Sequence, residues 1–170
     1  MWIHLSVKFE NFEDTILRLH NDAAQDKPTG IYKDLVCYLK EMVDSVSSFI
    51  NRYFYLFEPN PHLFLALEVN DLKDTETIKN KISQIQKPDF IDSVKIDLNT
   101  SDEGNGEAAI DFFYIGTKFA FFRISDDYKP GYYNNDEVKL VHCFSNQLFV
   151  THNNEVNFYL NCLRHRGVQV

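Results

Sequence analysis

Residues 52–69 read RYFYLFE-PNP-HLFLALEV and hold two aromatic and aliphatic runs around a short turn. Runs of this length that are rich in Phe, Tyr and Leu are typical of strands. The prolines of Pro59-Asn60-Pro61 favour a turn between them. The stretch therefore predicts a β-hairpin with strands over 52–58 and 62–69.

The residues before the hairpin predict one strand and two helices. The N-terminal run over 1–9 alternates in polarity, as a strand does. Asn11 to Asp22 carries apolar residues at helical spacing and predicts a short helix. Tyr32 to Ile50 repeats apolar residues at i, i+3, i+4 and i+7, the pattern of a helix that lies on a core.

The residues after the hairpin predict one helix and one strand. Asp71 opens a helix with a narrow apolar face, and Pro88 closes it. Ser93 to Leu98 predicts the last strand. Strand, helix, two strands, helix, strand is the order of a split βαβ sheet, so residues 1–99 predict an α+β fold with a ferredoxin-like βαββαβ sheet.

The remaining third, residues 108–167, predicts a helical C-terminal extension. Residues 99–107 are polar and form a loop, and Glu107 to Ile124 is apolar nearly all round if it is helical. Such a helix must be buried or covered by a partner, which leaves a homodimer open. Asp136 to Leu148 and a segment starting at Asn153 or Asn154 predict two more helices. A chain of 170 residues with this pattern is expected to form a single domain over 1–170.

Composition excludes several classes of function. Hydrophobic residues make up 44% of the chain, which is enough for a core and argues against disorder. A net charge of −8 repels a phosphate backbone, so we expect no nucleic-acid partner. No run approaches the roughly 18 apolar residues of a spanning helix, and the N-terminus lacks the pattern of a signal peptide. We therefore expect a cytoplasmic protein without a membrane partner.

Common catalytic and metal-binding motifs do not occur. The chain has no phosphate-binding glycine loop, no nucleophile elbow and no Cys-x-x-Cys. The scattered His and Cys residues match no tight ligand spacing, so we expect neither a metal nor a cofactor. The acidic residues Asp97, Asp102, Glu103, Glu107 and Asp111 are interpreted as a solvated face, as charge runs beside a loop usually are.

Two histidines are candidates for acid-base chemistry. His142 and Asn146 are i, i+4 partners on one face of the helix expected at 136–148. An imidazole there can move a proton, and the amide can hold the substrate or the ring. His62 opens the second hairpin strand and approaches His142 if the sheet packs on the C-terminal helices. The alternative is that these side chains are structural, at the rim of a core.

At these residues the chain resembles the C-terminal domain of lantibiotic dehydratases and its stand-alone relatives in thiopeptide-type bacteriocin biosynthesis. The resemblance runs through the Trp2 strand, Phe49-Ile50-Asn51-Arg52-Tyr53, Pro61-His62-Leu63-Phe64-Leu65, and Leu140-Val141-His142-Cys143-Phe144-Ser145-Asn146-Gln147-Leu148. It implies a domain that acts on ribosomally made peptides by eliminating glutamate from glutamylated Ser or Thr. Expected partners are a peptide substrate or a larger peptide-modifying enzyme.

The resemblance implies site residues, and the sequence departs from some of them. It makes His142 and His62 catalytic candidates. The candidates for substrate binding are Asn146, Arg52, Tyr53, Phe64 and Gln147. Phe64 and Ala66 stand where the family has arginines that hold the leaving carboxylate, and Gln147 replaces a helix arginine. A phenyl ring and a methyl group cannot supply guanidinium donors, which counts against glutamate elimination.

Two hypotheses about function follow from the sequence. The first is a peptide-modifying enzyme of the lyase type with His142 as acid or base. The second is a non-catalytic binding or self-assembly module that contacts a peptide or protein through an aromatic surface of Tyr53, Tyr55, Phe64, Tyr132 and Tyr133. The missing arginines favour the second within a peptide-modification pathway.

Overall fold

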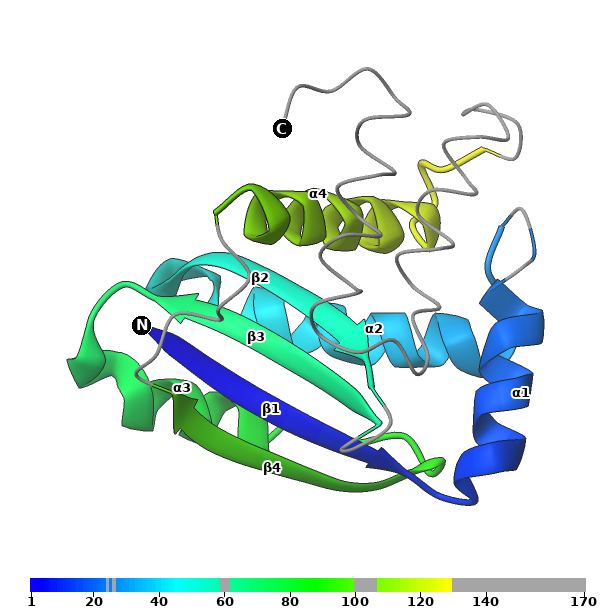
Figure 1. Cartoon of the computed structure of the whole chain (residues 1–170), viewed down its shortest axis with the longest axis horizontal. Coiled ribbons are helices and arrows are strands. Elements are labelled where there is room, and N and C mark those ends of the chain that lie inside the picture. Colours follow the sequence, from blue (N-terminus) through cyan, green and yellow to red (C-terminus); the bar gives the residue numbers. More distant parts are fainter. Residues whose placement is uncertain (24, 26, 59–61, 100–106, 130–170) are drawn as a thin grey trace.

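The computed structural model describes residues 1–23, 25, 27–58, 62–99 and 107–129 (Figure 1). In this part, one sheet is built from β1 (Trp2–Phe9), β2 (Ile50–Phe57), β3 (Leu63–Val69) and β4 (Ile91–Asn99). The strands lie in the order β2-β3-β1-β4, and every neighbouring pair is antiparallel. The α+β class is confirmed, and the structure has a strand at each of the four positions expected, 1–9, 52–58, 62–69 and 93–98.

Four helices accompany the sheet within the described ranges: α1 (Phe12–Ala23), α2 (Gly30–Val46), α3 (Thr75–Ser83) and α4 (Glu107–Arg123). Figure 1 shows α2 and α3 behind the sheet, α1 beside α2 at one end, and α4 along β2. The helices expected at 136–148 and from Asn153 or Asn154 lie outside the described residues.

The helix expected over 32–50 ends four residues early. Helix α2 stops at Val46 and is followed by a 3-10 turn, Ser47–Phe49. The Ser47 hydroxyl donates to the Asp44 carbonyl at 3.1 Å, a local bond that competes with the helical ladder. Ile50 already belongs to β2, where its backbone is extended with φ −127° and ψ 153°.

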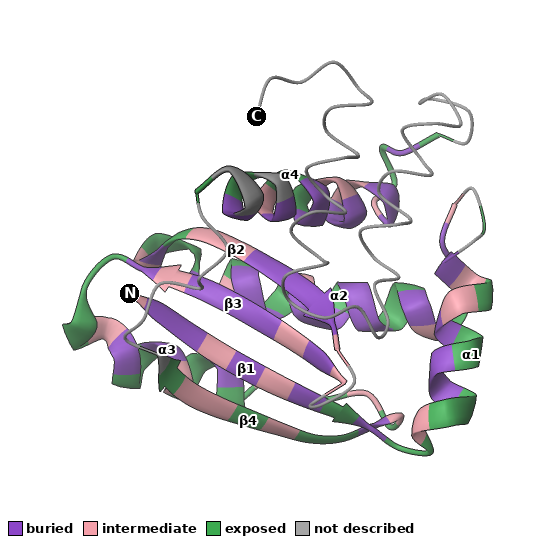
Figure 2. Ribbon diagram, in the orientation of Figure 1, coloured by how far each residue is buried: buried purple, intermediate pink, exposed green. Residues whose placement is uncertain are grey.

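The core lies between the sheet and α2. Along β1 every second residue, Ile3, Leu5 and Val7, is fully buried, and the alternation is visible in Figure 2. These side chains join a cluster that includes Leu39 and Met42 of α2. Burying each such side chain contributes about 1.5–3 kcal/mol, so the alternation along the strand fixes which face meets the helices.

Helix α4 covers the β2 edge of the sheet. Ile110 and Phe113 are buried in a second cluster with Trp2 and Phe54, on the face of the sheet opposite the main core. At the other end of α4, the Arg123 guanidinium donates to the Gln25 carbonyl at 2.7 Å. The helix therefore bridges the outer sheet face and the segment that follows α1.

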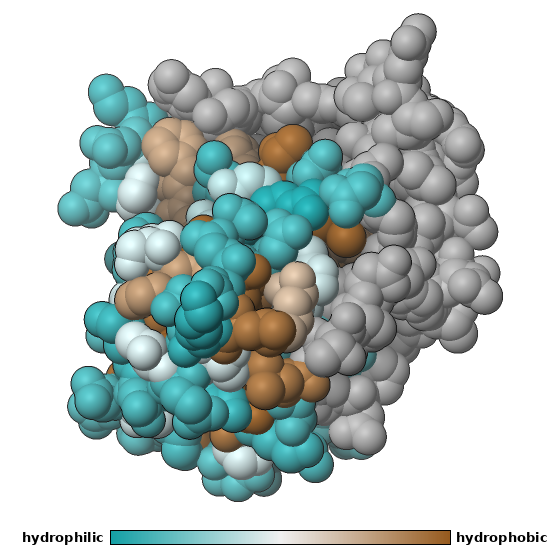
Figure 3. Space-filling model, turned by 90° about the vertical axis from the view of Figure 1, so that its left-hand side faces the viewer, coloured by the Kyte–Doolittle hydropathy of each residue, from teal (hydrophilic) through white to brown (hydrophobic). Residues whose placement is uncertain are grey.

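A few large apolar side chains reach the surface. Leu72 is 62% exposed, Leu98 48% and Ile115 64%, and Figure 3 shows apolar atoms between polar ones on the side where β4 ends. Helix α4, which is apolar nearly all round and was expected to be fully covered, is therefore exposed on one side, at Ile115. Among the described helices, none has the length and apolar content that crossing a membrane requires.

Candidate functional site

The outer face of the sheet carries two of the predicted substrate-binding residues, Arg52 and Phe64. Because side chains alternate along a strand, Arg52 and Phe54 of β2, Phe64 of β3 and His4 of β1 point away from α2. Phe64 packs against the second cluster, beside Phe54 and the fully buried Ala66. This side of the sheet is called the outer sheet face below and is defined by His4, Arg52, Phe54, Phe64 and Ala66, of which Phe54 and Ala66 are buried.

Arg52 is held by three carboxylates. Its Nε and Nη2 donate to the two oxygens of Glu68 at 2.8 and 2.9 Å, a bidentate pair. Its Nη1 donates to Glu107 at 2.7 Å and to Asp111 at 3.0 Å, both on α4. The guanidinium also lies 5.9 Å from the centre of the Trp2 ring, within cation-π range.

This network changes the charge behaviour of both partners in the bidentate pair. The hydrogen bonds to Glu68 and Glu107 raise the pKa of Arg52, and the Arg52 guanidinium lowers the pKa of Glu68. The side chains of Arg52 and Glu68 are each only 20% exposed. The network therefore fixes α4 to the sheet and occupies the donors that a substrate carboxylate would need.

Sequence reasoning missed the role of Glu107 and Asp111. They were interpreted as a solvated face, and both remain largely exposed, yet each also binds Arg52. Their i, i+4 spacing, which puts two carboxylates on one helix face, was the available signal. The partner, more than fifty residues earlier in the chain, was not visible in that spacing.

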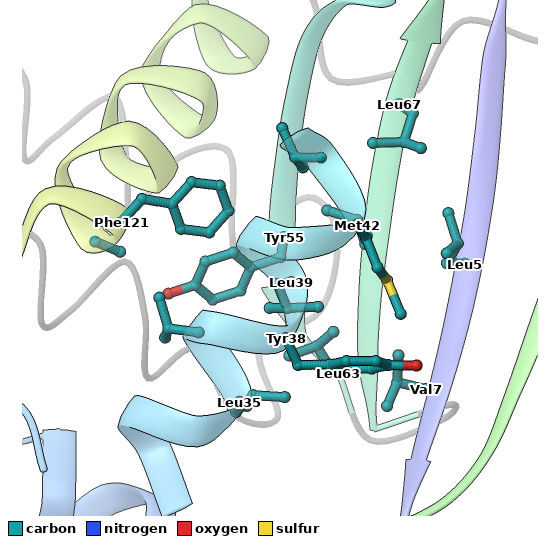
Figure 4. Packing of buried hydrophobic residues seen from close by; sticks show 14 of the residues in the cluster. Leu5, Val7, Leu35, Tyr38, Leu39, Met42, Tyr55, Leu63, Leu67 and Phe121 are labelled. Carbon is teal, nitrogen blue, oxygen red and sulfur yellow. The ribbon is translucent and has the colours of Figure 1, made fainter. Parts of the chain in front are cut away.

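The tyrosines of β2 are packed under α4. The Tyr53 ring lies 5.1 Å from Tyr114 and 5.7 Å from Phe121, and burial raises the pKa of Tyr53 to about 12. Tyr55 is fully buried, and its hydroxyl is 3.1 Å from that of Tyr32. Figure 4 shows Phe121 pointing from α4 towards Tyr55.

The proposed aromatic surface is thus wrong for Tyr55. Tyr55 belongs to the main core, where its ring lies 6.5 Å from Phe121 of α4 and its hydroxyl contacts Tyr32 of α2, so it is not on a surface. Tyr53 is half-buried. Tyr132 and Tyr133 lie outside the described residues.

Phe64 is half-buried on the outer sheet face. Its ring meets His4 edge-on at 4.8 Å and Phe54 at 6.0 Å. Burial lowers the pKa of His4, and the nearby Asp97 opposes that shift. Around the two positions where the family has arginines, the described surroundings are therefore mainly aromatic and aliphatic, with the half-buried His4 and Ser6 opposite Ala66 and Phe64.

His62 sits at the other end of β3 in a strained backbone conformation. Its φ is 112°, a region that residues with a side chain rarely adopt. Its Nδ1 accepts a hydrogen bond from the Phe9 N–H at 2.9 Å, and its ring stacks on Phe12 at 4.0 Å. These contacts tie the hairpin end to the end of β1 and hold the strained conformation in place.

The hydrogen bond from the Phe9 N–H determines the tautomer of the neutral His62 ring. An Nδ1 that accepts from an N–H carries no hydrogen, so the neutral ring has its hydrogen on Nε2. Burial, together with the positive charge of Lys8, lowers the pKa of His62, while Asp92 opposes the shift. At neutral pH the ring is therefore a hydrogen-bond donor through Nε2.

His62 and Arg52 lie at opposite ends of the sheet. Leu63 pairs with Val7, whereas Glu68, the partner of Arg52, pairs with Trp2. Five strand steps of about 3.4 Å separate these levels by roughly 17 Å. His142, Asn146 and Gln147 lie outside the described residues, so the expected meeting of His62 with His142 stays a prediction.

A further polar hollow, not predicted from the sequence, lies at the foot of α1. It has a volume of about 370 Å³ and is lined by Glu10, Asp14, Arg18 and Asp89, among others. Within the described ranges, no group of three or more His, Cys, Asp or Glu side chains is arranged to hold a metal ion.

No protein-family model, curated protein or solved structure matches this chain.

Proposed function

We propose that this chain is a peptide-binding domain in ribosomal peptide natural-product biosynthesis that does not carry out the glutamate elimination of lantibiotic dehydratases. The peptide as ligand comes from the resemblance along the Trp2, Arg52 and His62 segments. The loss of elimination rests on the chemistry of the outer sheet face.

The observation that carries the proposal is the state of Arg52. Among the described residues of the outer sheet face it is the one guanidinium, and Glu68, Glu107 and Asp111 hold it. Phe64 and Ala66 replace the expected arginines with apolar groups. A leaving carboxylate would meet no available guanidinium there, whereas an apolar peptide side chain would meet Phe64.

The test uses the tagged full chain to capture partners from its native lysate, with identification by mass spectrometry. We expect a precursor peptide or a larger peptide-modifying enzyme among the captured species. The captured peptide, made synthetically with glutamylated Ser, is then incubated with the chain. We expect binding without formation of a dehydroamino acid, and detection of that product would refute the loss of elimination.

Matched variants locate the binding surface. Phe64→Ala should weaken binding of the captured peptide by about tenfold or more if Phe64 is an anchor. Phe64→Leu keeps most of the bulk, and Leu17→Ala, at a 61% exposed position on α1, is the control. Equal binding by all three, with circular dichroism showing intact folds, would place the peptide elsewhere.

One observation favours a second candidate, a protein-interaction or self-assembly module of an unrelated pathway. In the described part of the chain, the outer edge of β4 has no pairing partner. Capture of only the chain itself, with no peptide and no modifying enzyme, would favour this second candidate over the first.

A further inference from the structure

Within the described residues, the outer edge of β4, a strand of nine residues, has no pairing partner. Strand β4 pairs with β1 on one side, and no described segment pairs with its other side. An exposed edge presents a row of backbone N–H and C=O groups that can pair with another strand. The opposite edge, β2, is covered by α4, so among the described strands β4 is the one whose outer edge can take a further strand.

The two faces of β4 differ in chemistry. Val94, Ile96 and Leu98 pair with Val7, Leu5 and Ile3 and so lie on the core side. The first two are half-buried, and Leu98 is 48% exposed. Lys95 and Asp97 lie on the outer side, where they form an ion pair at 2.9 Å with 76% and 48% of their side chains exposed. Strand β4 is thus apolar on its core side and charged on its outer side.

From this pattern we infer that β4 pairs with β4 of a second copy of the chain, antiparallel about a two-fold axis at Ile96. In that register Lys95 faces Asp97 of the second copy, and Asp97 faces its Lys95. On the core side, Val94 faces the second copy's Leu98, and the two Ile96 side chains face each other. Cross-strand neighbours come within about 5.5 Å between Cβ atoms, close enough for both kinds of contact.

Charge complementarity selects this register. A two-fold axis one residue earlier would set Lys95 against itself, and an axis one residue later would set Asp97 against itself. Like charges directly opposite each other destabilise a strand pair. The register at Ile96 also covers Leu98, which a monomer leaves half-exposed, and it joins two four-stranded sheets with closed symmetry.

The test measures self-association of the full chain by sedimentation equilibrium. We expect a concentration-dependent monomer-dimer equilibrium. Lys95→Asp alone, and Asp97→Lys alone, should each raise the dimer dissociation constant by about tenfold or more, because each sets two pairs of like charges across the axis. The double variant with both changes restores opposite charges and should recover the wild-type constant.

Three results would overturn the inference. A wild-type chain that stays monomeric at all concentrations would leave the edge to a strand from another protein. A dimer that both single reversals leave unchanged would use another surface. A double variant that dimerises no better than the single variants would rule out the register. Circular dichroism at low concentration checks that each variant folds. The result does not depend on the proposed peptide binding.

Discussion

The two edges of the sheet solve the same problem in different ways. At β2, helix α4 covers the strand, and the buried Thr117 hydroxyl accepts the outward N–H of Tyr55 at 3.3 Å. At β4, the described chain provides no such cover, and the exposed residues are Asp92, Ser93, Lys95 and Leu98. The edge of a sheet can be covered by an apolar helix of the same chain, or it can stay uncovered and carry charged side chains that limit which strands pair with it.

The largest effect is expected from removing the apolar contact that holds α4 on β2. Phe113→Ala deletes a fully buried ring packed 5.2 Å from Phe54. We expect the free energy of unfolding in urea to fall by about 3–5 kcal/mol, because the cavity adds to the lost transfer energy.

The control for this variant lies on the same helix. Ile115→Ala changes a side chain that is 64% exposed and should alter the unfolding free energy by about 0.5 kcal/mol or less. If the two variants lose the same unfolding free energy, helix propensity, rather than the packing of α4 on β2, dominates the effect.

The next effect is expected from the Arg52 network. Arg52→Met removes the guanidinium and leaves the half-buried Glu68 carboxylate without its bidentate partner. We expect a loss of about 2 kcal/mol at pH 7, measured by urea unfolding, because charge-assisted hydrogen bonds are stronger than neutral ones.

The pH dependence of the same variant gives a sharper test. The pKa of Glu68 is lowered in the folded state from 4.5, so its contribution is present above about pH 4.5 and is lost as the pH falls through the lowered value. The difference between wild type and Arg52→Met should therefore shrink below pH 4.5. A constant difference down to pH 2 would contradict this origin.

A smaller effect is expected at the hydrogen bond on the β2 edge. Thr117→Val keeps the shape of the side chain but removes the acceptor for the Tyr55 N–H. We expect a loss of about 1–2 kcal/mol and faster hydrogen exchange at the Tyr55 amide, because a buried donor is left unpaired.

Thr117→Ser is the matched variant because it keeps the hydroxyl. It should preserve the slow exchange of the Tyr55 amide even where the lost methyl group lowers stability. Fast exchange in the Ser variant would indicate that packing, not the hydrogen bond, protects this amide.

The smallest effect is expected at the open edge. Lys95→Ala removes one partner of an exposed ion pair and should change the unfolding free energy of the monomer by about 0.5 kcal/mol or less. The measurement belongs at low protein concentration, because association stabilises the folded state by mass action. A loss as large as that of Arg52→Met would show that the β4 edge is not open in the monomer.

Several elements could be predicted from local pattern, and others could not. The alternation over 1–9 and the apolar stripe after Tyr32 predicted β1 and α2, since periodicity is a property of consecutive residues. The end of α2 was predicted too late, because Phe49 and Ile50 continue the apolar helical spacing. The chain leaves the helix after Val46, where Ser47 begins a 3-10 turn. Of the candidate site residues, those near His142 lie outside the described part. For Arg52 and His62, the sequence predicted a role in the site but not the residues that they contact.

The sequence by itself determined the α+β fold class and the absence of guanidinium groups at Phe64 and Ala66. Only the tertiary structure decided that Arg52 is held by Glu107 and Asp111, 55 and 59 residues away, and that His62 binds the Phe9 amide. It also decided which edge of the sheet is covered. The physical reason is that periodicity is set by backbone geometry within one element, whereas ion pairs and covered edges depend on which elements pack together.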